Sequence, residues 1–501
     1  MPLTFFLALL CACVRSGAAD RRTAFADYVT ANQTAVVREL VDFLAIPNVA
    51  ADRANIRRNA THLRRMLEKR QFSTELLETA GNPLVYGELR SANAKRTILF
   101  YAHYDGQPVH PPGWKQASPF TPILRERRLE DGGAERPIAQ PRYDNEWRIY
   151  GRSASDDKSP IVALLTALDA LRANGQQPTS NIRVILDGEE EAGSPNLAPA
   201  IPPHRDKLAA ELMVILDGPR HPSGRPTVVF GARGNLAIEL TVYGPRFALH
   251  SGHYGNWVPN PAIRLAQLLA SMKSPDGRIL VEGFENGLGP LPPDEQSLLD
   301  EVPDDADALK RLFGIAGHER ADLPTLQYAL QRPSLNIRGM SSGFVGDQAR
   351  TIIPDRATAA IDIRLVKETP GAAMAEKLRA HIRKQGFHIV EAEPDDATRA
   401  KYERIVRVQA RSETEAYRTP ASDPQASALV ASLETMLGSK PVRIRTSGGT
   451  VPISQFIKTL GIPAVSVPIV NFDNNQHSEN ENLRLGHLFD GIVVIAAVLT
   501  M

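Results

Sequence analysis

Acidic and imidazole side chains come directly after several short apolar runs of this sequence. His103 and Asp105 follow a run that ends at Tyr101, and three consecutive glutamates follow another that ends at Leu186. Taken singly, each has an ordinary structural interpretation, such as a surface pair, a solvated acidic loop or a helix N-cap. Taken together, these residue types could bind metal ions or act in acid–base catalysis. Two aspartates that follow a glycine turn and a histidine near the C-terminal end belong to the same set. Its members are His103, Asp105, Asp156, Asp157, Glu189, Glu190, Glu191, Asp217 and His477.

These side chains must be positioned by an α/β framework. The apolar runs 97–101, 182–186 and 212–216 have the length and composition of strands, and 24–45 and 160–173 have helical spacing. Strands that alternate with helices predict a mostly parallel sheet flanked by helices, and ligands bind such a sheet at the carboxyl ends of its strands. Carboxylates gathered at that edge repel one another, and bound cations commonly neutralise such a cluster in proteins. The pattern favours metal ions without fixing which carboxylate binds them.

The pattern of elements changes twice along the chain. After Pro219, the sequence suggests an α+β unit that extends to about residue 412, and from about residue 420 the α/β pattern returns. We therefore predict a catalytic domain split in sequence into 20–228 and 413–501, with a second domain inserted over 229–412. The Pro- and Gly-rich stretch 107–148 is expected to form loops over the site.

Composition narrows the range of partners and metals. The chain has 501 residues, 43% of them hydrophobic, and a formal net charge of only +1. This is unlike the basic footprint of a nucleic-acid-binding protein, so a small molecule or a peptide is the expected partner. The two cysteines, Cys11 and Cys13, both lie in the first 19 residues. A mature chain without them would hold a metal with His, Asp and Glu, a ligand set that suits Zn²⁺ or Mn²⁺.

The first 19 residues resemble an export signal. An apolar run from Leu3 to Val14 precedes the small residues Gly17, Ala18 and Ala19, which suit a signal peptidase, although no Lys or Arg comes first. An uncleaved anchor is one alternative, but the run is far shorter than the roughly 20 residues that span a bilayer. Lipid attachment at Cys13 is another. We expect an exported protein without a transmembrane span.

Six stretches of the sequence resemble the M20 family of metallopeptidases, which includes carnosinase-like dipeptidases, glutamate carboxypeptidases and acetylornithine deacetylases. They occur in the family's order and cover nearly all of the chain after residue 19. The stretches are AHYDGQP (102–108), GRSASDDK (151–158), GEEEAGS (188–194), LHSG (249–252), GGTVP (448–452) and HSENE (477–481).

The resemblance implies a role for each member of the acidic and imidazole set. His103 and Asp217 would hold one divalent metal ion, Glu191 and His477 the other, and Asp156 would bridge both. Two such cations can polarise a substrate carbonyl and lower the pKa of a shared water. The remaining roles fall to Glu190 as the general base and to Asp105, which would orient His103. Asp157, Glu189 and Asp187 are expected to be structural or solvated.

The resemblance also implies residues that contact the substrate. His250 matches a histidine that stabilises the oxyanion, often across a dimer interface, and Arg364 matches an arginine that grips a carboxylate. The simpler interpretations are a surface turn for His250 and a strand-edge salt bridge for Arg364. The loop Gly448, Gly449 and Thr450 would contact substrate, and the inserted domain would act as a lid or dimerisation domain. Three positions depart from the family's glycines: Ser153, Ser159 and Asn256.

We predict from these features a metallopeptidase of the dipeptidase or carboxypeptidase type that uses two divalent ions. Zinc is the expected metal, with manganese or cobalt as alternatives, and a homodimer is the expected assembly. An N-acyl-amino-acid deacylase would use the same site, and a catalytically silent binding protein would have lost ligands or the base, all of which are present here. Substrate side-chain preference is left open.

Overall fold

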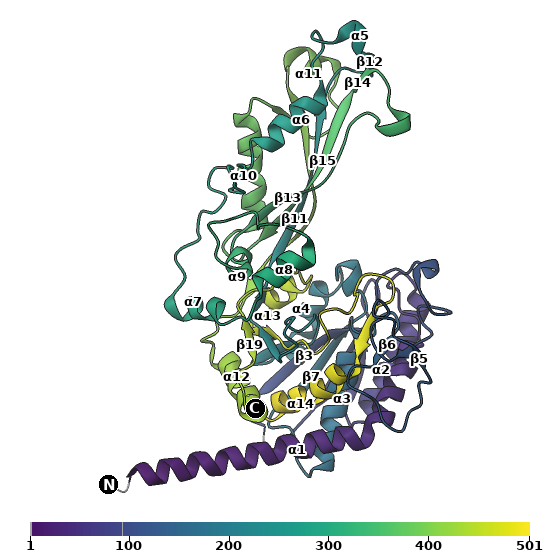
Figure 1. Cartoon of the computed structure of the whole chain (residues 1–501), viewed down its shortest axis with the longest axis vertical. Helices are drawn as coiled ribbons and strands as arrows, with labels where there is room; N and C mark the ends of the chain where they lie inside the picture. The colour runs from purple at the N-terminus through teal and green to yellow at the C-terminus, as the bar shows by residue number, and fades with distance from the viewer. Residues whose placement is uncertain (1–2, 93) are drawn as a thin grey trace.

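The computed structural model describes residues 3–92 and 94–501. Two sheets organise this part of the chain: an eight-stranded sheet in the lower half of Figure 1 and a five-stranded sheet in the elongated upper half. The five-stranded sheet is built from the middle of the chain, whereas the eight-stranded sheet draws strands from both sides of it. The predicted fold class, a mostly parallel sheet flanked by helices with an inserted α+β lid, is confirmed.

The eight-stranded sheet is parallel at its centre. Four of its strand pairs are parallel, and the antiparallel pairs are β1 with β2, β2 with β7 and β20 with β9. The central strands are continuous apolar runs because both of their faces are buried. In spatial order the strands are β1 (Ser73–Leu77), β2 (Leu84–Leu89), β7 (Asn181–Asp187), β3 (Thr97–His103), β8 (Leu212–Ile215), β20 (Ala464–Ser466), β9 (Thr227–Val229) and β19 (Val442–Ile444).

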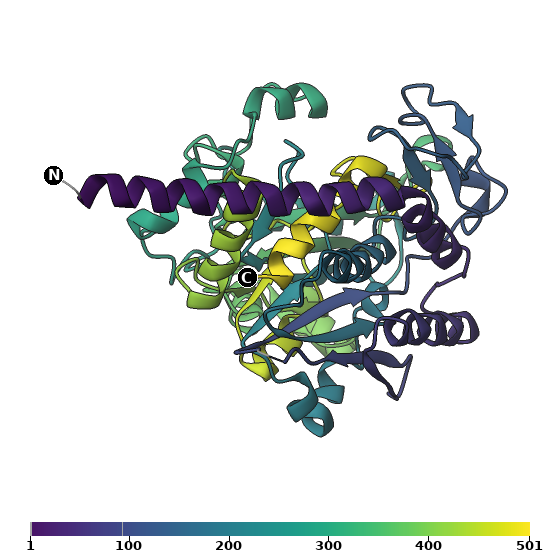
Figure 2. The ribbon, with the colours of Figure 1, turned by 90° about the horizontal axis from the view of Figure 1, so that it is seen from below.

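Helices cover both faces of this sheet. On one face α1 (Leu3–Leu44), α3 (Lys158–Ala173), α12 (Pro424–Leu437) and α14 (Leu485–Leu499) pack against one another, and α1 crosses α14 in Figure 2. On the other face lie α4 (Ile201–Leu208) and α13 (Ser454–Leu460). Helix α2 (Arg53–Glu68) belongs to the first face, where it contacts β1 and β2. Successive side chains of β3 point to opposite faces of the sheet. Ile98 and Phe100 pack in the core under the first face, and Leu99 and Tyr101 pack in the core under the other.

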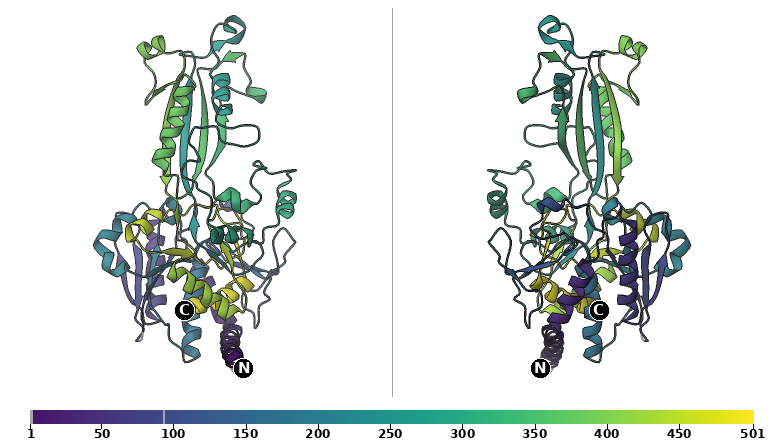
Figure 3. Two further views of the ribbon diagram at one scale, coloured as in Figure 1. Left: turned by 90° about the vertical axis from the view of Figure 1, so that its left-hand side faces the viewer. Right: turned by 90° about the vertical axis from the view of Figure 1, so that its right-hand side faces the viewer.

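The five-stranded sheet has its own core and a free edge. Helices α6 (Pro261–Ala270) and α10 (Gly371–Lys384) pack on it, and its long strands run along the elongated direction of the molecule in Figure 3. Its order is β13 (Ser334–Ser341), β15 (Arg356–Leu365), β11 (Gly234–Tyr243), β17 (Ile405–Thr414) and β16 (His388–Val390). From Asn336 onward the edge strand β13 is exposed, which leaves its outer backbone groups without a neighbouring strand in this sheet.

A short pair of strands links the two halves. The chain enters the five-stranded part after β10 (Gly231–Ala232) and leaves it before β18 (Tyr417–Arg418), and these two strands pair antiparallel. A Cβ atom on Gly231 would lie 2.3 Å from the carbonyl oxygen of Tyr417. Glycine therefore allows the two crossings of the chain to approach each other at this link.

The expectation of loops alone over 107–148 is wrong in part. This stretch contains a 3₁₀ turn, η1 (Pro111–Gly113), and two short strands, β4 (Ile123–Arg125) and β5 (Glu135–Arg136). They join β6 (Arg148–Tyr150) and β21 (Asn482–Arg484) in a four-stranded sheet. Strands of two or three residues are too short to show an apolar alternation, and β21, which pairs with β6 in the same sheet, is more than 300 residues away in the sequence.

Smaller elements complete the upper half. The tip most distant from the eight-stranded sheet in Figure 1 carries β12 (Leu249–His250), α5 (Ser251–Tyr254), β14 (Ile352–Ile353) and α11 (Asp396–Lys401). Helices α7 (Pro293–Asp300), α8 (Ala306–Phe313) and α9 (Leu326–Leu330) lie between the two sheets in the same view. Of the remaining 3₁₀ turns, η4 (Gly346–Gln348) belongs to this half, whereas η2 (Glu190–Ala192) and η3 (Ala198–Ala200) lie between β7 and α4 in the lower half.

Helix α1 begins earlier than the spacing of apolar residues predicted. The helix expected over 24–45 is the second half of a continuous helix of 42 residues. The predicted signal segment forms its first turns from Leu3, whereas Met1, Pro2 and the side chains of Cys11 and Cys13 lie outside what the structure describes. Among the described residues, no helix combines the length and the apolar character needed to cross a membrane.

Candidate metal centre and catalytic site

The acidic and imidazole side chains meet at one edge of the eight-stranded sheet. His103 is the last residue of β3, Asp217 follows β8, and Glu190 and Glu191 begin η2 just after β7. These three strands are neighbours in the order β7, β3, β8 and run parallel, so their carboxyl ends reach the same edge. Asp156 comes from the turn between β6 and α3, and His477 from the segment between β20 and β21.

The predicted ligands form two groups that share one carboxylate. Ligand atoms of His103, Asp156 and Asp217 all lie within 4.8 Å of one another, and so do those of Asp156, Glu191 and His477. Nε2 of His103 is 2.8 Å from Oδ1 of Asp156, whereas Nε2 of His477 is 3.1 Å from Oδ2. Each oxygen of Asp156 thus faces a different group, which is the arrangement required of a bridging ligand between two metal ions.

The charges of this cluster call for cations. Burial, together with repulsion from Asp156, raises the pKa of Glu191 to about 7 and that of Asp217 to about 6. Burial raises the pKa of Glu190 well above its usual value, and Asp217 and Asp156 add to the effect. Asp156 itself is buried, but hydrogen bonds from His103 and His477 hold its pKa well below the usual range. Several carboxylates that oppose one another's ionisation, with two imidazoles among them, fit two bound divalent ions.

Asp105 joins the two strand ends that carry the ligands. Its Oδ1 accepts a hydrogen bond from the backbone N–H of Glu190 at 3.1 Å, and its Oδ2 accepts one from Glu191 at 3.0 Å. Nδ1 of His103 lies 3.4 Å from the same Oδ1 and 3.3 Å from the main-chain oxygen of Asp105. Asp105 is therefore placed to orient the His103 ring, and it also fixes the backbone of the two glutamates.

Glu481 organises the turn that presents Asp156, a role that sequence reasoning missed. Its buried carboxylate accepts backbone hydrogen bonds from Ser153, Ser155 and Asp156 at 2.8 to 2.9 Å, and Nη1 of Arg152 lies 2.8 Å away. The only sequence signal was its place at the end of the stretch 477–481. Gln107, in the stretch 102–108, has no role that the sequence indicates, and its Nε2 donates to Oε2 of Glu191.

The departures from the family's glycines keep the turns intact. Ser153 adopts a φ of +63°, in the left-handed region where glycine is usual, and Asn48 donates a hydrogen bond to its hydroxyl at 2.8 Å. Asn256 also has a φ of +63°, and asparagine tolerates that region better than most residues. Ser159 is buried in the first turn of α3.

Three acidic neighbours of the centre have structural partners, as expected. Oε1 of Glu189 accepts from the backbone N–H of Asn82 at 2.8 Å, and its Oε2 accepts from the Asn196 side chain at 2.7 Å. Asp187 accepts from the hydroxyl of Ser194 at 2.6 Å. Asp157 accepts from the backbone N–H of His103 at 3.2 Å.

Arg364, predicted to grip a substrate carboxylate, lies beside the predicted substrate loop. Nη1 of Arg364, on β15, donates to Oγ1 of Thr450 at 2.8 Å, and Nε of Arg364 is 3.3 Å from Oδ2 of Asp362. Apart from the glycine and its two chain neighbours, no described residue has an atom within 4 Å of the position that a Cβ of Gly449 would take, so its backbone is open to approach. Arg364 therefore makes both the salt bridge of the simpler interpretation and a contact with the predicted substrate loop.

His250 lies apart from the metal centre of its own chain. It belongs to β12 at the far tip of the upper half (Figure 1), and its side chain is exposed. Its Nδ1 accepts a hydrogen bond from the N–H of Gly252 at 3.1 Å, and its ring lies 4.5 Å from that of His253. Within one chain the structure does not bring His250 to the other predicted site residues.

Comparisons with known proteins agree with this architecture. The sequence model of peptidase family M20/M25/M40 matches residues 99–501. A Cys-Gly metallodipeptidase of Schizosaccharomyces pombe is 27% identical over 473 residues, 91% of this chain and 93% of that protein. The Beta-Ala-His dipeptidase of Homo sapiens is 27% identical over 425 residues, 83% of this chain and 76% of that protein. The crystal structure of an M20 family metallo-carboxypeptidase from Sulfolobus solfataricus matches with a TM-score of 0.75 at 30% identity, over 93% and 98% of the two chains.

Proposed function

Because this chain belongs to peptidase family M20/M25/M40, we propose that it hydrolyses the amide bond of dipeptides or other small peptides by means of two divalent metal ions. The observation that carries the proposal is the pair of ligand groups that share Asp156, with Glu190 beside Glu191. The Cys-Gly and Beta-Ala-His dipeptidases among its relatives favour dipeptides over N-acyl amino acids.

The metal proposed for both positions is zinc, with manganese or cobalt as alternatives. His103 and Asp217 would hold one ion and Glu191 and His477 the other, with Asp156 shared by the two ligand groups. Imidazole and carboxylate donors suit zinc, and residues 20–501 contain no cysteine. When bound, two such ions supply Lewis acidity that polarises a substrate carbonyl and makes a water more acidic.

Glu190 performs the proton transfers. It belongs to neither ligand group, so its carboxylate is free to take a proton from the attacking water and pass it to the leaving amine. Burial favours the protonated form of Glu190 by raising its pKa, which strengthens it as a proton acceptor. The hydrogen bond from its backbone to Asp105 fixes where this carboxylate lies relative to His103.

Arg364 and the loop 448–450 hold the carboxylate end of the substrate. A guanidinium binds a carboxylate through two parallel N–H donors, and Thr450 already fixes one nitrogen of Arg364. This arrangement supports a substrate with a free carboxylate on the leaving side, as a dipeptide has.

The oxyanion is stabilised by His250 from a second copy of the chain. His250 is exposed at the tip of the five-stranded part, remote from the metal centre of its own chain (Figure 1). The free edge of β13, with Ile337 and Met340 exposed on it, offers a surface through which two copies can pair. The proposed assembly is a homodimer in which each inserted domain supplies His250 to the partner's site.

Mixing two inactive variants tests this assembly. His250→Ala and Glu190→Gln homodimers are each expected to lose activity by about a hundredfold or more. After subunit exchange, one site of the mixed dimer has both native residues, so activity is expected to return to about a quarter of the native value, as one active site in half of the dimers. The measurement is kcat before and after mixing, with oligomeric state followed by light scattering. A monomer, or no recovery despite proven exchange, contradicts the proposal.

A substrate panel tests the reaction. Purified protein supplied with zinc or manganese is expected to release amino acids from Cys-Gly, β-Ala-His and simple dipeptides faster than from N-acetyl and N-succinyl amino acids. A chelator is expected to abolish the activity and added metal to restore it, because the proposed reaction depends on the Lewis acidity that the two ions would supply. Liquid chromatography of the products measures each rate. Faster cleavage of the N-acyl substrates would favour the deacylase, and no cleavage of any substrate would contradict the proposed reaction.

The protein is exported in this proposal through its N-terminal segment, with cleavage after Ala19. The apolar run from Leu3 to Val14 and the small residues at 17–19 support it. N-terminal mass spectrometry of secreted protein would separate cleavage from retention of the segment or lipid attachment at Cys13.

A further inference from the structure

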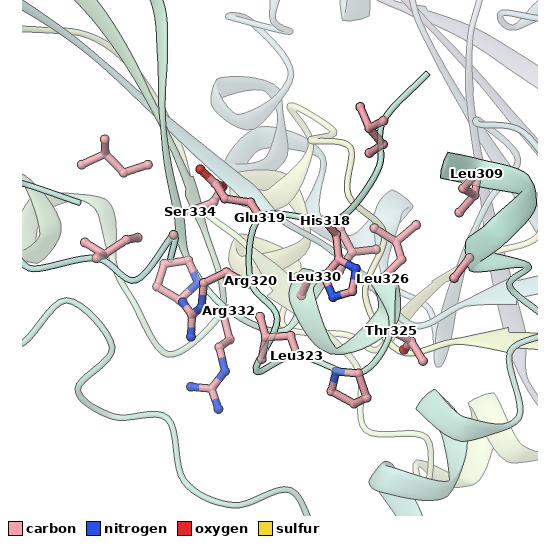
Figure 4. A pocket seen from close by; sticks show the side chains of 18 of the residues that line it. Leu309, His318, Glu319, Arg320, Leu323, Thr325, Leu326, Leu330, Arg332 and Ser334 are labelled. Atoms are coloured by element: carbon pink, nitrogen blue, oxygen red, sulfur yellow. The ribbon is translucent and has the colours of Figure 1, made fainter. Parts of the chain in front are cut away.

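A cavity of about 340 Å³ lies between α8, α9 and the first residues of β13, and none of the predicted site residues lines it. Figure 4 shows Leu309 on α8 on one side, Leu326 and Leu330 near the centre, and Arg320 and Arg332 side by side on the other. The volume falls within the roughly 300–1,000 Å³ typical of small-molecule sites.

The apolar walls of this cavity are not sealed by the rest of the chain. Phe313, Ile315 and Leu326 line it and remain 61%, 45% and 46% exposed. Large apolar side chains gathered at a pocket in this way mark a binding surface, because isolated exposed ones are common and clustered ones are not. The walls therefore suit an apolar group of a ligand.

One cation of the cavity, Arg233, has no carboxylate partner among the residues that the structure describes. Four of its basic residues are paired: Lys273 with Glu319, Lys310 with Asp307, Arg320 with Asp322 and Arg332 with Glu285. Within the described part of the chain, no carboxylate lies within salt-bridge distance of Arg233.

Arg233 is nonetheless almost fully buried. Its Nη2 donates to the carbonyl oxygen of Arg332 at 2.7 Å and to Oγ of Ser334 at 3.1 Å, while its buried Nε has no partner among the described residues. Burial lowers its pKa to about 10 and the charge of Arg364 adds to the effect, while the carboxylate of Asp362, beyond salt-bridge distance, offsets part of it. A buried guanidinium with an unused donor is unfavourable unless an anion meets it.

We propose that this cavity binds an apolar group that carries a carboxylate, with the apolar part between α8 and α9 and the carboxylate at Arg233. The class of ligand is an amphipathic monocarboxylate. The charge of Arg233 favours the carboxylate of such a molecule, and the exposed apolar walls favour its apolar part.

The cavity adjoins the predicted carboxylate site of the substrate. Ser334, on its wall, lies directly across from Arg364 in the β13–β15 register, and a Cβ atom on Gly448 would lie 3.1 Å from Leu330. The carboxylate could therefore belong to a separate amphipathic acid or to a peptide with a long apolar side chain. The second source rests on the proposed function, whereas binding of a free acid does not.

Calorimetry on the whole protein tests the binding with octanoate as the probe. Octanoate is expected to bind saturably with one site per chain. Acetate, which has only the charge, is expected to show no saturation at the same concentrations, and octan-1-ol, which has only the chain, to bind at least about tenfold more weakly. Absence of saturable octanoate binding, or equal binding of octan-1-ol, would overturn the proposal.

Two variants and a matched control locate the site. Arg233→Met is expected to weaken octanoate binding about tenfold or more, since it removes the counter-charge and keeps the bulk. Leu326→Glu places a like charge on the wall at the start of α9 and is expected to weaken binding similarly. Leu312→Glu should leave it unchanged, because Leu312 is 69% exposed on the neighbouring α8 and does not line the cavity. Unaltered binding by Leu326→Glu, or equal losses in both glutamate variants, would place the ligand elsewhere.

Kinetics distinguish the two sources. If the cavity accepts a substrate side chain, octanoate raises KM for dipeptides with a C-terminal leucine and leaves kcat unchanged. If it accepts a separate acid, octanoate changes kcat for Gly-Gly and Gly-Leu alike. Either result supports the site. Should no dipeptide be hydrolysed, the calorimetric result still stands as the test of the cavity.

Discussion

Replacing Glu190 by Gln is expected to lower kcat for the best dipeptide by about 10²–10⁴-fold while both metal ions stay bound. An amide of the same shape cannot accept the proton of the attacking water. The metal ligands are untouched, because Glu190 belongs to neither ligand group. Steady-state kinetics give the loss in kcat, and metal analysis of the dialysed variant gives the ion content.

Glu189→Gln is the matched control for this experiment. Glu189 is the adjacent residue, but its carboxylate accepts from Asn82 and Asn196 and takes no part in either ligand group. We expect kcat to change by no more than a few-fold. A Glu190→Gln variant that keeps both ions and turns over near the native rate would show that another group transfers the proton.

Replacing Asp156 by Asn is expected to remove both metal ions and all activity. The two oxygens of Asp156 face different ligand groups, so one substitution withdraws an anionic donor from each. Removal of a side chain that only hydrogen-bonds to a metal ligand lowers metal affinity about 10–100-fold. Removal of a ligand shared by both ions should lower the affinity by more than that. Elemental analysis after equilibrium dialysis measures the ions retained per chain.

Asp157→Asn provides the comparison. Asp157 is also buried and adjacent in sequence, but within the described part of the chain the hydrogen-bond donor to its carboxylate is the backbone N–H of His103. This variant is expected to retain both ions. If Asp156→Asn instead binds two ions as tightly as the native protein, Asp156 is not the shared ligand.

The sequence predicted best what depends on strand ends. His103, Asp217 and Glu191 follow three apolar runs, and any parallel sheet built from those runs brings their carboxyl ends to one edge. Asp156 and His477 follow no such run, so their place in the centre was expected only from the resemblance to a family. The structure places them beside the other three.

Contacts between distant segments could not be predicted in this way. Glu481 accepts hydrogen bonds from three backbone N–H groups more than 320 residues earlier in the chain. No local sequence pattern predicts that a carboxylate makes such distant contacts. The short strands β4 and β5 exist because they pair, not because of their composition. The position of His250 follows from the length of the strands that carry it to the tip, which apolar spacing alone does not give.

The two ligand groups differ in their access to solvent, and this has a consequence for metal exchange. The side chain of His103 is fully buried, whereas that of His477 is 54% exposed and belongs to a residue with a φ of +61° in an irregular segment. Water and competing chelators reach the second group first. The ion beside His477 should therefore leave and be replaced faster than its neighbour, so that brief chelation followed by a second metal would yield a hetero-dinuclear protein with a known location for each ion.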